Sequence, residues 1–370
     1  MALKLEIQVP VKARSYQSVV QKFAVATGLK LEHTRKAREL FDYSATDYYI
    51  NLIDSLVNEG KNDAAKRLLM AIIPNNIETF EYSDVEDGIG EENSVENHSI
   101  LSHFFENRIL IGISSRCPQY CRYCFRRRRL GKKSAKVTID DINLAFDYIE
   151  RSVNKNKLND KIAIDEIILS GGEPLNIPLV QLEYLISRIN KIDNIKTCRI
   201  DTKLLAVKPH VFTKRLLSLI SSLKAPYVLN HFIHPEEITA EVATKVSSLL
   251  KSGIITGAHI PILHGINDDY RTIKELVNKL YFNKIRPYYL IQYIPTKWTE
   301  QFRVPLEKSI EIREKLVKEC SGFSIPALIV YLPHGKGKAI INSKRDIRKI
   351  ENGYVLFNVH NEEVLYEEKI

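Results

Sequence analysis

The chain of 370 residues is long enough for one large α/β barrel with additions, or for two to three average domains. With 44% hydrophobic and 27% charged residues it has a globular composition that excludes wholesale disorder, and 15 Gly and 14 Pro exclude a collagen-like scaffold. No run approaches about 18 consecutive apolar residues, and residues 1–16 lack the apolar core of a signal peptide, so we expect a cytoplasmic protein without a membrane span. The net charge of +9 is compatible with nucleic acid or with anionic cofactors and substrates, but no recognised nucleic-acid-binding motif accompanies it.

Four segments are expected along the chain. Residues 1–81 are predicted to be a helical region, because apolar residues recur at helical spacing until Pro74 ends the last helix. Residues 82–106 begin with an acidic, glycine-containing and aperiodic stretch, which predicts a linker. Residues 107–300 are predicted to form the main α/β domain, and residues 301–370 a C-terminal segment that ends in a hairpin at about residues 353–366.

Short β-branched runs alternate with amphipathic segments in the main domain. The expected strands are 109–114, 165–170, 197–202, 227–232, 256–262 and 286–292, with a further apolar run at 327–331. The expected helices between them are 138–154, 179–192, 211–223, 236–252 and 270–283. Six strand–helix units in succession predict a parallel sheet with helices outside, either open or curled into a barrel. Catalytic groups in such folds lie at the C-terminal ends of the strands.

The five cysteines are unevenly spread. Cys117, Cys121 and Cys124 form C-x3-C-x2-C directly after the first expected strand, whereas Cys198 and Cys320 are isolated. An odd number in a chain without a leader argues against a disulfide framework. Structural zinc usually has four ligands in paired short spacings, whereas three thiolates suit a [4Fe–4S] cluster with one iron left open.

Polar residues also end the next three expected strands. Two glycines after a strand let the backbone approach a ligand closely, and a neighbouring carboxylate can accept a hydrogen bond from an ammonium group. The residues concerned are Gly171, Gly172 and Glu173 after the second strand, Thr202 and Lys203 after the third, and His231 at the end of the fourth.

The cysteine motif, with Tyr123 before its third cysteine and a Gly-Gly-Glu segment after the next strand, resembles radical S-adenosylmethionine (SAM) enzymes. The resemblance implies that the open iron chelates the amino and carboxylate groups of SAM and that the Gly-Gly-Glu segment meets the amino group. An electron from the cluster then cleaves SAM to methionine and a 5′-deoxyadenosyl radical. A small electron donor such as flavodoxin or ferredoxin is implied as a partner.

A longer series of segments is similar to the lysine 2,3-aminomutase family. In order they are CPQYCRYCFRRRRLG, LSGGEPL, HPEEIT, GINDD, RPYYLIQ, QFRVP and LPHGKGK, spread between about residues 30 and 367. The resemblance implies a partial (β/α)6 barrel with an N-terminal helical region and a short C-terminal extension, sometimes assembled into a homo-oligomer. It also implies pyridoxal 5′-phosphate (PLP) as a second cofactor. The implied reaction moves the α-amino group of an amino acid to C3 by radical chemistry and gives a β-amino acid.

The resemblance assigns three further residues to the site. Lys338 matches the lysine that holds PLP, and we expect His334 and Lys336 to lower its pKa by like-charge repulsion. Arg126 matches the arginine that binds the substrate α-carboxylate, a task suited to a bidentate guanidinium pair. Arg108 matches an arginine near the PLP phosphate.

Four positions depart from the family pattern. Phe104 stands where a second basic residue near the phosphate is expected, and Asp269 replaces a zinc-ligating cysteine, so we expect no zinc. Ile294 and Tyr331 stand where lysine 2,3-aminomutases place two aspartates around the substrate ε-ammonium. Free lysine is therefore not the expected substrate, unless another acid such as Glu300 substitutes, and an uncharged side chain is preferred over an acidic one.

Two other functions remain compatible with the sequence. A relative within the same family modifies a translation factor, so the substrate could be a protein-bound lysine. The consecutive residues 126–129, all arginine, with Lys132 and Lys133 after them, could instead bind RNA. The lysine turn beside Arg126 favours a free amino acid, and nucleic acid is not the expected partner.

Overall fold

The computed structural model describes residues 35–80, 85–91, 94–95, 100–130, 137–158 and 163–368, together with Val19 and Phe23. Residues 1–16, for which we expect no signal peptide, lie outside the described residues, as do the basic residues Lys132 and Lys133. Within the described ranges, no helix has the length and apolar character that a membrane span requires.

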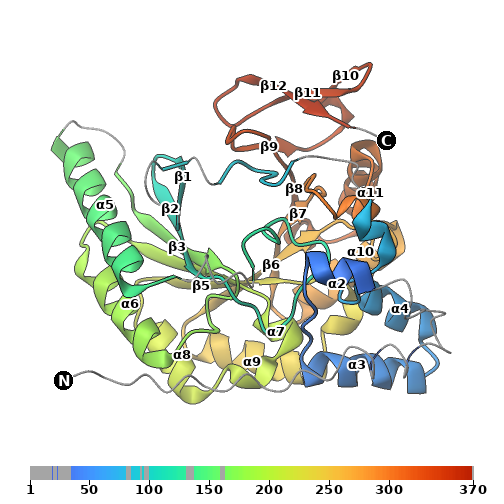
Figure 1. Ribbon diagram of the computed structural model, residues 1–370, viewed down its shortest axis with the longest axis horizontal. Coiled ribbons are helices and arrows are strands. Elements are labelled where there is room, and N and C mark those ends of the chain that lie inside the picture. The colour runs from blue at the N-terminus through green and yellow to red at the C-terminus, as the bar shows by residue number, and fades with distance from the viewer. Residues whose placement is uncertain are drawn as a thin grey trace.

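One curved sheet of nine strands organises the molecule, and its strand order from β1 to β9 is the order of the chain (Figure 1). Seven strands run parallel, namely β2 (Arg108–Ser114), β3 (Glu166–Gly171), β4 (Thr197–Thr202), β5 (Pro226–His231), β6 (Ile255–Pro261), β7 (Arg286–Ile291) and β8 (Ala327–Tyr331). The two edges are antiparallel strands, β1 (Leu101–Phe105) and β9 (Lys338–Ile341). Because the sheet ends at β1 and β9 instead of closing, the expected partial barrel is confirmed.

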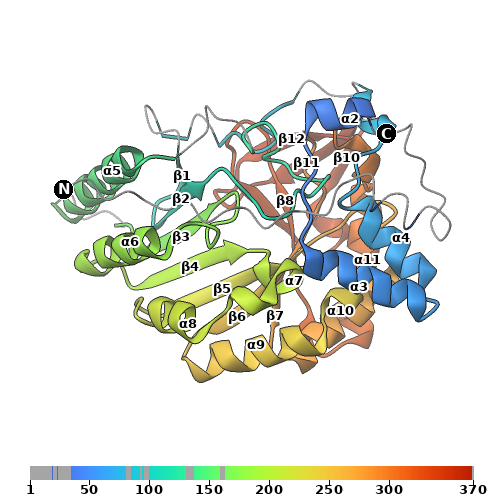
Figure 2. The ribbon, with the colours of Figure 1, turned by 60° about the horizontal axis from the view of Figure 1, so that its bottom comes forward.

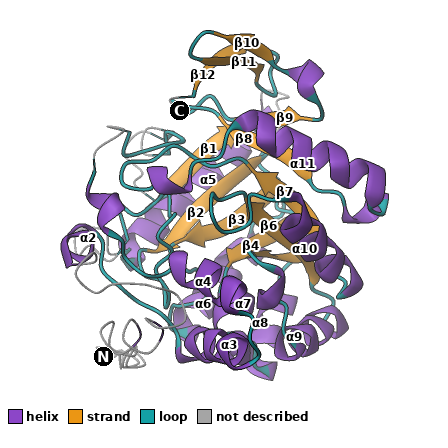
Figure 3. Ribbon diagram, turned by 90° about the vertical axis from the view of Figure 1, so that its right-hand side faces the viewer, coloured by secondary structure: helices purple, strands orange, loops and turns teal. Residues whose placement is uncertain are grey.

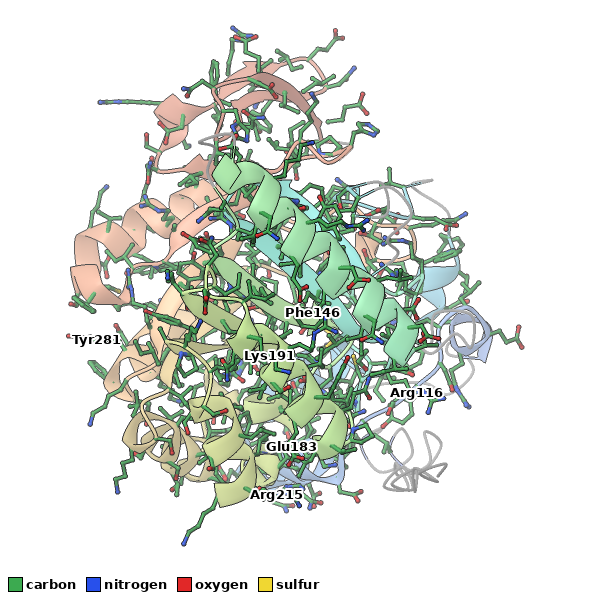
Figure 4. All side chains as sticks on the ribbon, turned by 90° about the vertical axis from the view of Figure 1, so that its left-hand side faces the viewer. Arg116, Phe146, Glu183, Lys191, Arg215 and Tyr281 are labelled. Carbon is green, nitrogen blue, oxygen red and sulfur yellow. The ribbon has the colours of Figure 1, made fainter. Side chains whose placement is uncertain are left out.

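Helices cover the convex face of the sheet (Figure 2). They are α5 (Ile139–Leu158), α6 (Leu179–Lys191), α8 (Lys214–Ser221), α9 (Ala240–Lys251), α10 (Tyr270–Phe282) and α11 (Leu306–Glu319). Their polar sides face solvent, as Lys191 illustrates, and Glu183 of α6 pairs with Arg215 of α8 at 3.0 Å (Figure 4). Their apolar sides, such as Phe146 of α5, are buried against the strands. This layering follows from the helical spacing of the apolar residues.

The strands alternate between the helix-covered face and the concave face. In β4, Cys198, Ile200 and Thr202 are buried, while Arg199 and Asp201 lie between them and line the cavity on the concave side. This period of two, inherent in a strand, is what carries charged side chains into the barrel interior.

The N-terminal helices pack at one end of the barrel (Figure 3). They are α2 (Arg35–Leu40), α3 (Asp47–Asn58) and α4 (Asn62–Met70), followed by the short turn η2 (Asn76–Thr79). The Tyr49 hydroxyl of α3 donates to Glu237 at 2.9 Å, and Arg67 of α4 pairs with Asp269 at 2.9 Å. Asp269 also caps α10 through the Thr272 N–H, so this residue has a structural role.

Two of the expected segments contain additional strands. Residues 101–105 of the expected linker form β1, and residues of the C-terminal segment form β8 and β9 of the main sheet. The expected hairpin consists of β11 (Gly353–Phe357) and β12 (Glu363–Glu367), and β10 (Arg348–Ile350) adds a third strand. The sheet therefore continues past residue 300, because β8 pairs in parallel with β7.

Candidate active site

A cavity of about 250 Å³ lies on the concave side of the sheet, at the C-terminal ends of the parallel strands. All site residues named from the sequence line it, which are Arg108, Cys117, Cys121, Tyr123, Cys124, Arg126, Gly171, Gly172, Glu173, Thr202, Lys203, His231 and Lys338. The residues come from five strands or the loops that follow them, so only the tertiary fold brings them together.

The three clustered cysteines lie in the loop after β2. Burial is the main reason that the pKa of each thiol is raised, that of Cys124 to about 12. Neighbouring cysteines also raise the pKa of Cys117 and Cys124. Thiols in such a setting become thiolates when a metal bonds to them, and they suit an iron–sulfur cluster better than a role as free nucleophiles. Cys198, by contrast, is buried within β4 and is not among the residues that line the cavity.

A buried ion-pair network holds the cysteine loop in place. Arg122 and Glu78 are both 0% exposed and pair through two bonds, Nη2 to Oε2 at 2.7 Å and Nε to Oε1 at 3.0 Å. Arg127 donates to the same carboxylate at 2.9 Å, and Arg122 Nη1 also donates to the Phe41 carbonyl at 3.0 Å. The N-terminal region, through Glu78 and Phe41, is therefore part of the cysteine-loop scaffold.

The arginine run faces the interior. Arg127 and Arg128 are 3% and 7% exposed, and Arg128 pairs with Asp87 at 3.1 Å. Within the described residues, the run does not form the exposed basic patch that RNA binding needs. Arg127 and Arg128 therefore do not support the RNA-binding hypothesis, because sequence proximity does not reveal which side chains are buried.

The two glycines at the end of β3 have a more specific role than the sequence indicated. A Cβ on Gly171 would lie 2.6 Å from the Ser114 carbonyl oxygen, and a Cβ on Gly172 would lie 2.8 Å from the backbone of Arg116. The Gly172 N–H donates to Ser114 O at 2.6 Å, and the Glu173 N–H donates to Arg116 O at 2.9 Å. The glycines thus bring the end of β3 against the cysteine loop, and both motifs line the same cavity.

Glu173 connects the ends of β3 and β4. Its carboxylate accepts from the Thr202 hydroxyl at 2.6 Å and from the Lys203 N–H at 2.9 Å, and burial raises its pKa to about 7. The Lys203 ammonium donates to Glu237 at 3.1 Å and to the His231 carbonyl at 3.3 Å. Glu173 lines the cavity, and its role as an acceptor for the SAM ammonium group stays a prediction.

Lys338 begins β9, after a turn in which His334, Gly335 and Gly337 adopt positive φ angles. Its Nζ donates to the Tyr289 hydroxyl at 2.5 Å. Burial, followed by Arg108 and Arg199, lowers the pKa of Lys338 to about 7.

The expected cause of that lowered pKa is corrected. His334 and Lys336 are not the groups that lower it, because the Lys336 side chain is exposed and approaches Glu362 at 3.9 Å. Like-charge repulsion does contribute, but it comes from arginines on the strands and not from the turn itself.

Arg108 and Phe104 flank the lysine turn. Arg108 lies over the Phe105 ring, 3.9 Å from its centre, and its charge reaches Lys338. Phe104 packs against the turn, since a Cβ on Gly335 would lie 3.4 Å from Phe104 Cε1. A phosphate beside Lys338 would therefore find Arg108 as a cationic partner, with Phe104 as a packing residue.

Aromatic and imidazole rings form the wall beside Lys338. His259 stacks on Tyr289 with ring centres 5.6 Å apart, and its Nδ1 lies 3.4 Å from His231 Nε2. Burial lowers the pKa of both histidines to about 3, so both are neutral. His259 and Tyr289 had no assigned role from the sequence, because a lone ring in a strand is ordinarily a packing residue.

Two carboxylates on the cavity wall are hydrogen-bonded, since Glu91 pairs with Arg126 and Glu173 accepts the bonds described above. Asp201 lies 3.7 Å from Arg199, and its Oδ1 has no hydrogen-bond partner among the described residues. Ile294 and Tyr331 line the cavity without charge, and Glu300 is not among its lining residues. Glu91 was missed because it falls in the acidic stretch interpreted as a linker, where no periodic pattern marks it.

Comparisons with known proteins show what the chain as a whole is similar to. The family model described as "Radical SAM superfamily" matches residues 111–277 of the chain. The chain is 33% identical over 306 residues to an L-lysine 2,3-aminomutase of Methanococcus maripaludis, which covers 82% of this chain and 67% of that protein. It is 30% identical over 350 residues to an L-lysine 2,3-aminomutase of Acetoanaerobium sticklandii, covering 94% and 81%. A glutamate 2,3-aminomutase of Clostridioides difficile is 27% identical over 319 residues, covering 86% and 72%.

Proposed function

Since the chain belongs to the lysine 2,3-aminomutase family of radical SAM enzymes, we propose that it is a PLP-dependent amino-acid 2,3-aminomutase that produces a β-amino acid. An enzyme of this superfamily uses SAM and a [4Fe–4S] cluster. The observation that carries the proposal is one cavity lined by the three cysteines, Arg126 and Lys338.

The residues of the chain divide the work around the cavity. When bound, the cluster and SAM supply a hydrogen-abstracting radical, and PLP supplies covalent activation of the amino group. Cys117, Cys121 and Cys124 would hold the iron, and Glu173 would accept from the SAM ammonium group. The protein then keeps water from the radical by burial of the site.

The part of the cavity around Lys338, Tyr289 and Arg108, which we call the lysine side, supplies a nucleophile and a hydroxyl that can exchange a proton with it. With a pKa of about 7, Lys338 has a large neutral fraction near neutral pH, and a neutral amine is the nucleophilic form. The Tyr289 hydroxyl, 2.5 Å from Nζ, can exchange a proton with it, and the Tyr288 hydroxyl donates to Tyr289 at 2.8 Å. Arg108 would neutralise a phosphate at this side.

The charges on the cavity wall favour a substrate with an uncharged side chain. Glu91 is paired with Arg126, Glu173 is assigned to SAM, and Asp201 faces Arg199 at 3.7 Å, while Ile294 and Tyr331 provide no acid at the two positions where lysine 2,3-aminomutases place aspartates. Burying an unpaired ammonium costs several kcal/mol. The substrate we propose is therefore an aliphatic or aromatic α-amino acid and not free lysine.

A protein-bound lysine fits this site less well. Its α-carboxylate is part of a peptide bond, so it would leave the buried Arg126 without the anion that the proposed reaction brings to it. Ile294 and Tyr331, at the positions that would face its ammonium group, are uncharged.

The deciding experiment is an anaerobic reaction of the reconstituted protein with SAM, PLP, a chemical reductant and a panel of amino acids. The panel contains lysine, glutamate, alanine, leucine, phenylalanine and tyrosine, and mass spectrometry detects β-isomers. We expect turnover of an uncharged member and none with Lys338→Ala. If lysine has the highest kcat/KM, the substrate part of the proposal is wrong; if no amino acid isomerises, the reaction itself is wrong.

A further inference from the structure

Residues 85–91 cross one side of the cavity, and we call them the strap. The Val85 carbonyl accepts from the Lys297 N–H at 2.8 Å, in the loop after β7. The Ile89 carbonyl accepts from the Gly335 N–H at 3.2 Å, in the turn before β9. The strap is thus bonded to two of the segments that form the lysine side of the cavity.

Two glycines allow the strap to approach these segments closely. A Cβ on Gly90 would lie 2.3 Å from the Gly335 nitrogen, and Gly90 has a φ of +74°. A Cβ on Gly88 would lie 2.5 Å from the Pro295 carbonyl oxygen. The backbone of the strap contacts other backbone segments closely at both points, and these contacts define its position relative to the turn.

The last residue of the strap, Glu91, is 3% exposed and binds Arg126 side-on. Arg126 Nε donates to Glu91 Oε2 at 2.8 Å, and Nη2 donates to Oε1. Arg126 Nη1 donates to the Ser170 hydroxyl at 3.1 Å and to the Gly171 carbonyl at 3.2 Å. A guanidinium has five N–H groups, and these contacts use four of them. The remaining N–H is on Nη2.

We propose that Glu91 is a positioning residue for Arg126. It holds the guanidinium so that a single N–H of Nη2 is presented to a substrate carboxylate. Because the strap is also bonded to the turn that leads to Lys338, the orientation of the guanidinium depends on the position of that turn. The bidentate contact expected from the sequence is thereby reduced to a one-point contact. The inference rests on the proposed function only in that Arg126 receives the substrate carboxylate.

The alternative role for Glu91 is a purely electrostatic one. A carboxylate this close to Arg126 also repels an incoming carboxylate, so a Glu91 without a positioning role would weaken substrate binding. The two roles predict opposite changes in KM when the charge is removed, which makes them separable.

The first test uses the reconstituted enzyme and whichever amino acid it isomerises. Glu91→Gln should raise KM and lower kcat/KM by about 100-fold, since small displacements of a positioned group have effects of this order. Glu91→Asp, which keeps the charge, should recover about tenfold of that loss. Glu311→Gln, which removes an exposed carboxylate paired with Lys344, is the matched control and should leave both constants unchanged. A KM that falls in Glu91→Gln would overturn the proposal.

A double-mutant cycle tests whether Glu91 acts through Arg126. Arg126→Gln and the combination of Arg126→Gln with Glu91→Gln should be equally impaired, because the second change has nothing left to position. If the two losses multiply, Glu91 acts independently of Arg126 and the inference is wrong.

The last test does not depend on turnover. In cluster-reconstituted protein, hydrogen exchange at the Gly335 amide and phenylglyoxal labelling of Arg126 should both rise about tenfold in Glu91→Gln, and neither should change in Glu311→Gln. Unchanged exchange and labelling would refute the positioning role even in an active aminomutase. If both rise while no amino acid is isomerised, the proposed function fails and the coupling of Glu91 to Arg126 stands.

Discussion

The cysteine side and the lysine side of the cavity bury their titratable groups in different ways. At the cysteine side, charged side chains are buried in pairs, as Glu78 is with Arg122 and Arg127. At the lysine side, Lys338 and His259 lie against aromatic rings and have cationic neighbours. Paired burial keeps both partners charged and makes a rigid frame, whereas burial without an opposite charge favours the neutral form.

The difference fits the two tasks that we propose. A cluster loop must hold several ligands at fixed positions, and a network of charged hydrogen bonds can do this because breaking one bond leaves a buried charge. A lysine that reacts as a nucleophile must be neutral, and burial beside Arg108 and Arg199 achieves this. Removing groups from each side in turn should therefore have different consequences.

The largest effect is expected from loss of a cysteine ligand. Cys121→Ala removes one of the three thiolates. Anaerobic reconstitution should then no longer give about four irons per chain, and the absorbance at about 400 nm should be lost. Iron analysis and the absorption spectrum measure this. Cys198→Ala is the matched control, because this thiol is buried inside β4, and it should keep the cluster. A fully loaded Cys121→Ala protein would remove the cluster assignment.

The lysine side is tested by Lys338→Ala, which should lose the covalent PLP adduct near about 420 nm and keep the cluster. Borohydride trapping followed by peptide mass spectrometry locates the adduct, and Lys336→Ala, which removes an exposed amine, should still form it. Trapping at Lys336 would place the site two residues away from the assignment.

The pKa of Lys338 also predicts a pH dependence for adduct formation. A pKa of about 7 is below the usual lysine value, so the neutral amine predominates above about pH 7 and the rate should level off there. A rate that still rises steeply toward about pH 10 would show that the pKa of the Lys338 amine is not lowered as proposed. Stopped-flow absorbance from about pH 6 to pH 10 distinguishes the two profiles.

Loss of the paired charge at the cysteine side should affect stability. Glu78→Gln leaves two buried guanidinium groups with one neutral amide, so the free energy of unfolding should fall by about 3–5 kcal/mol. Glu311→Gln, in an exposed pair with Lys344, should change it by less than about 1 kcal/mol. Chemical denaturation of both proteins measures the difference. Equal effects would contradict the rigid-frame interpretation.

The smallest effect concerns substrate preference. Ile294→Asp together with Tyr331→Asp places two carboxylates on the cavity wall and should raise kcat/KM for lysine by about 10- to 100-fold relative to an uncharged amino acid. Glu300→Gln should not alter the ratio, because Glu300 does not line the cavity. An unchanged lysine ratio in the double variant would mean that the side chain of the substrate lies elsewhere.

The expected elements agree closely with the observed ones in the barrel, and less closely at the edges of the sheet. The strand expected at residues 197–202 is β4, and the helix expected at 270–283 is α10, because long amphipathic helices and buried β-branched strands have distinct periods. β1 was not expected, because its residues have neither a clear period nor a turn signal, and its formation depends on pairing with β2.

The sequence alone determined the order of the barrel elements and the three-cysteine motif, because periodicity and short spacings are local properties. Only the tertiary structure decided that Arg127 and Arg128 are buried, that Glu91 binds Arg126, and that Arg108 and Arg199 lower the pKa of Lys338. Each of these depends on contacts between residues far apart in the chain, 35 positions for Glu91 and Arg126. Burial and electrostatic coupling are set by such distant neighbours, which the spacing of residues along a sequence does not specify.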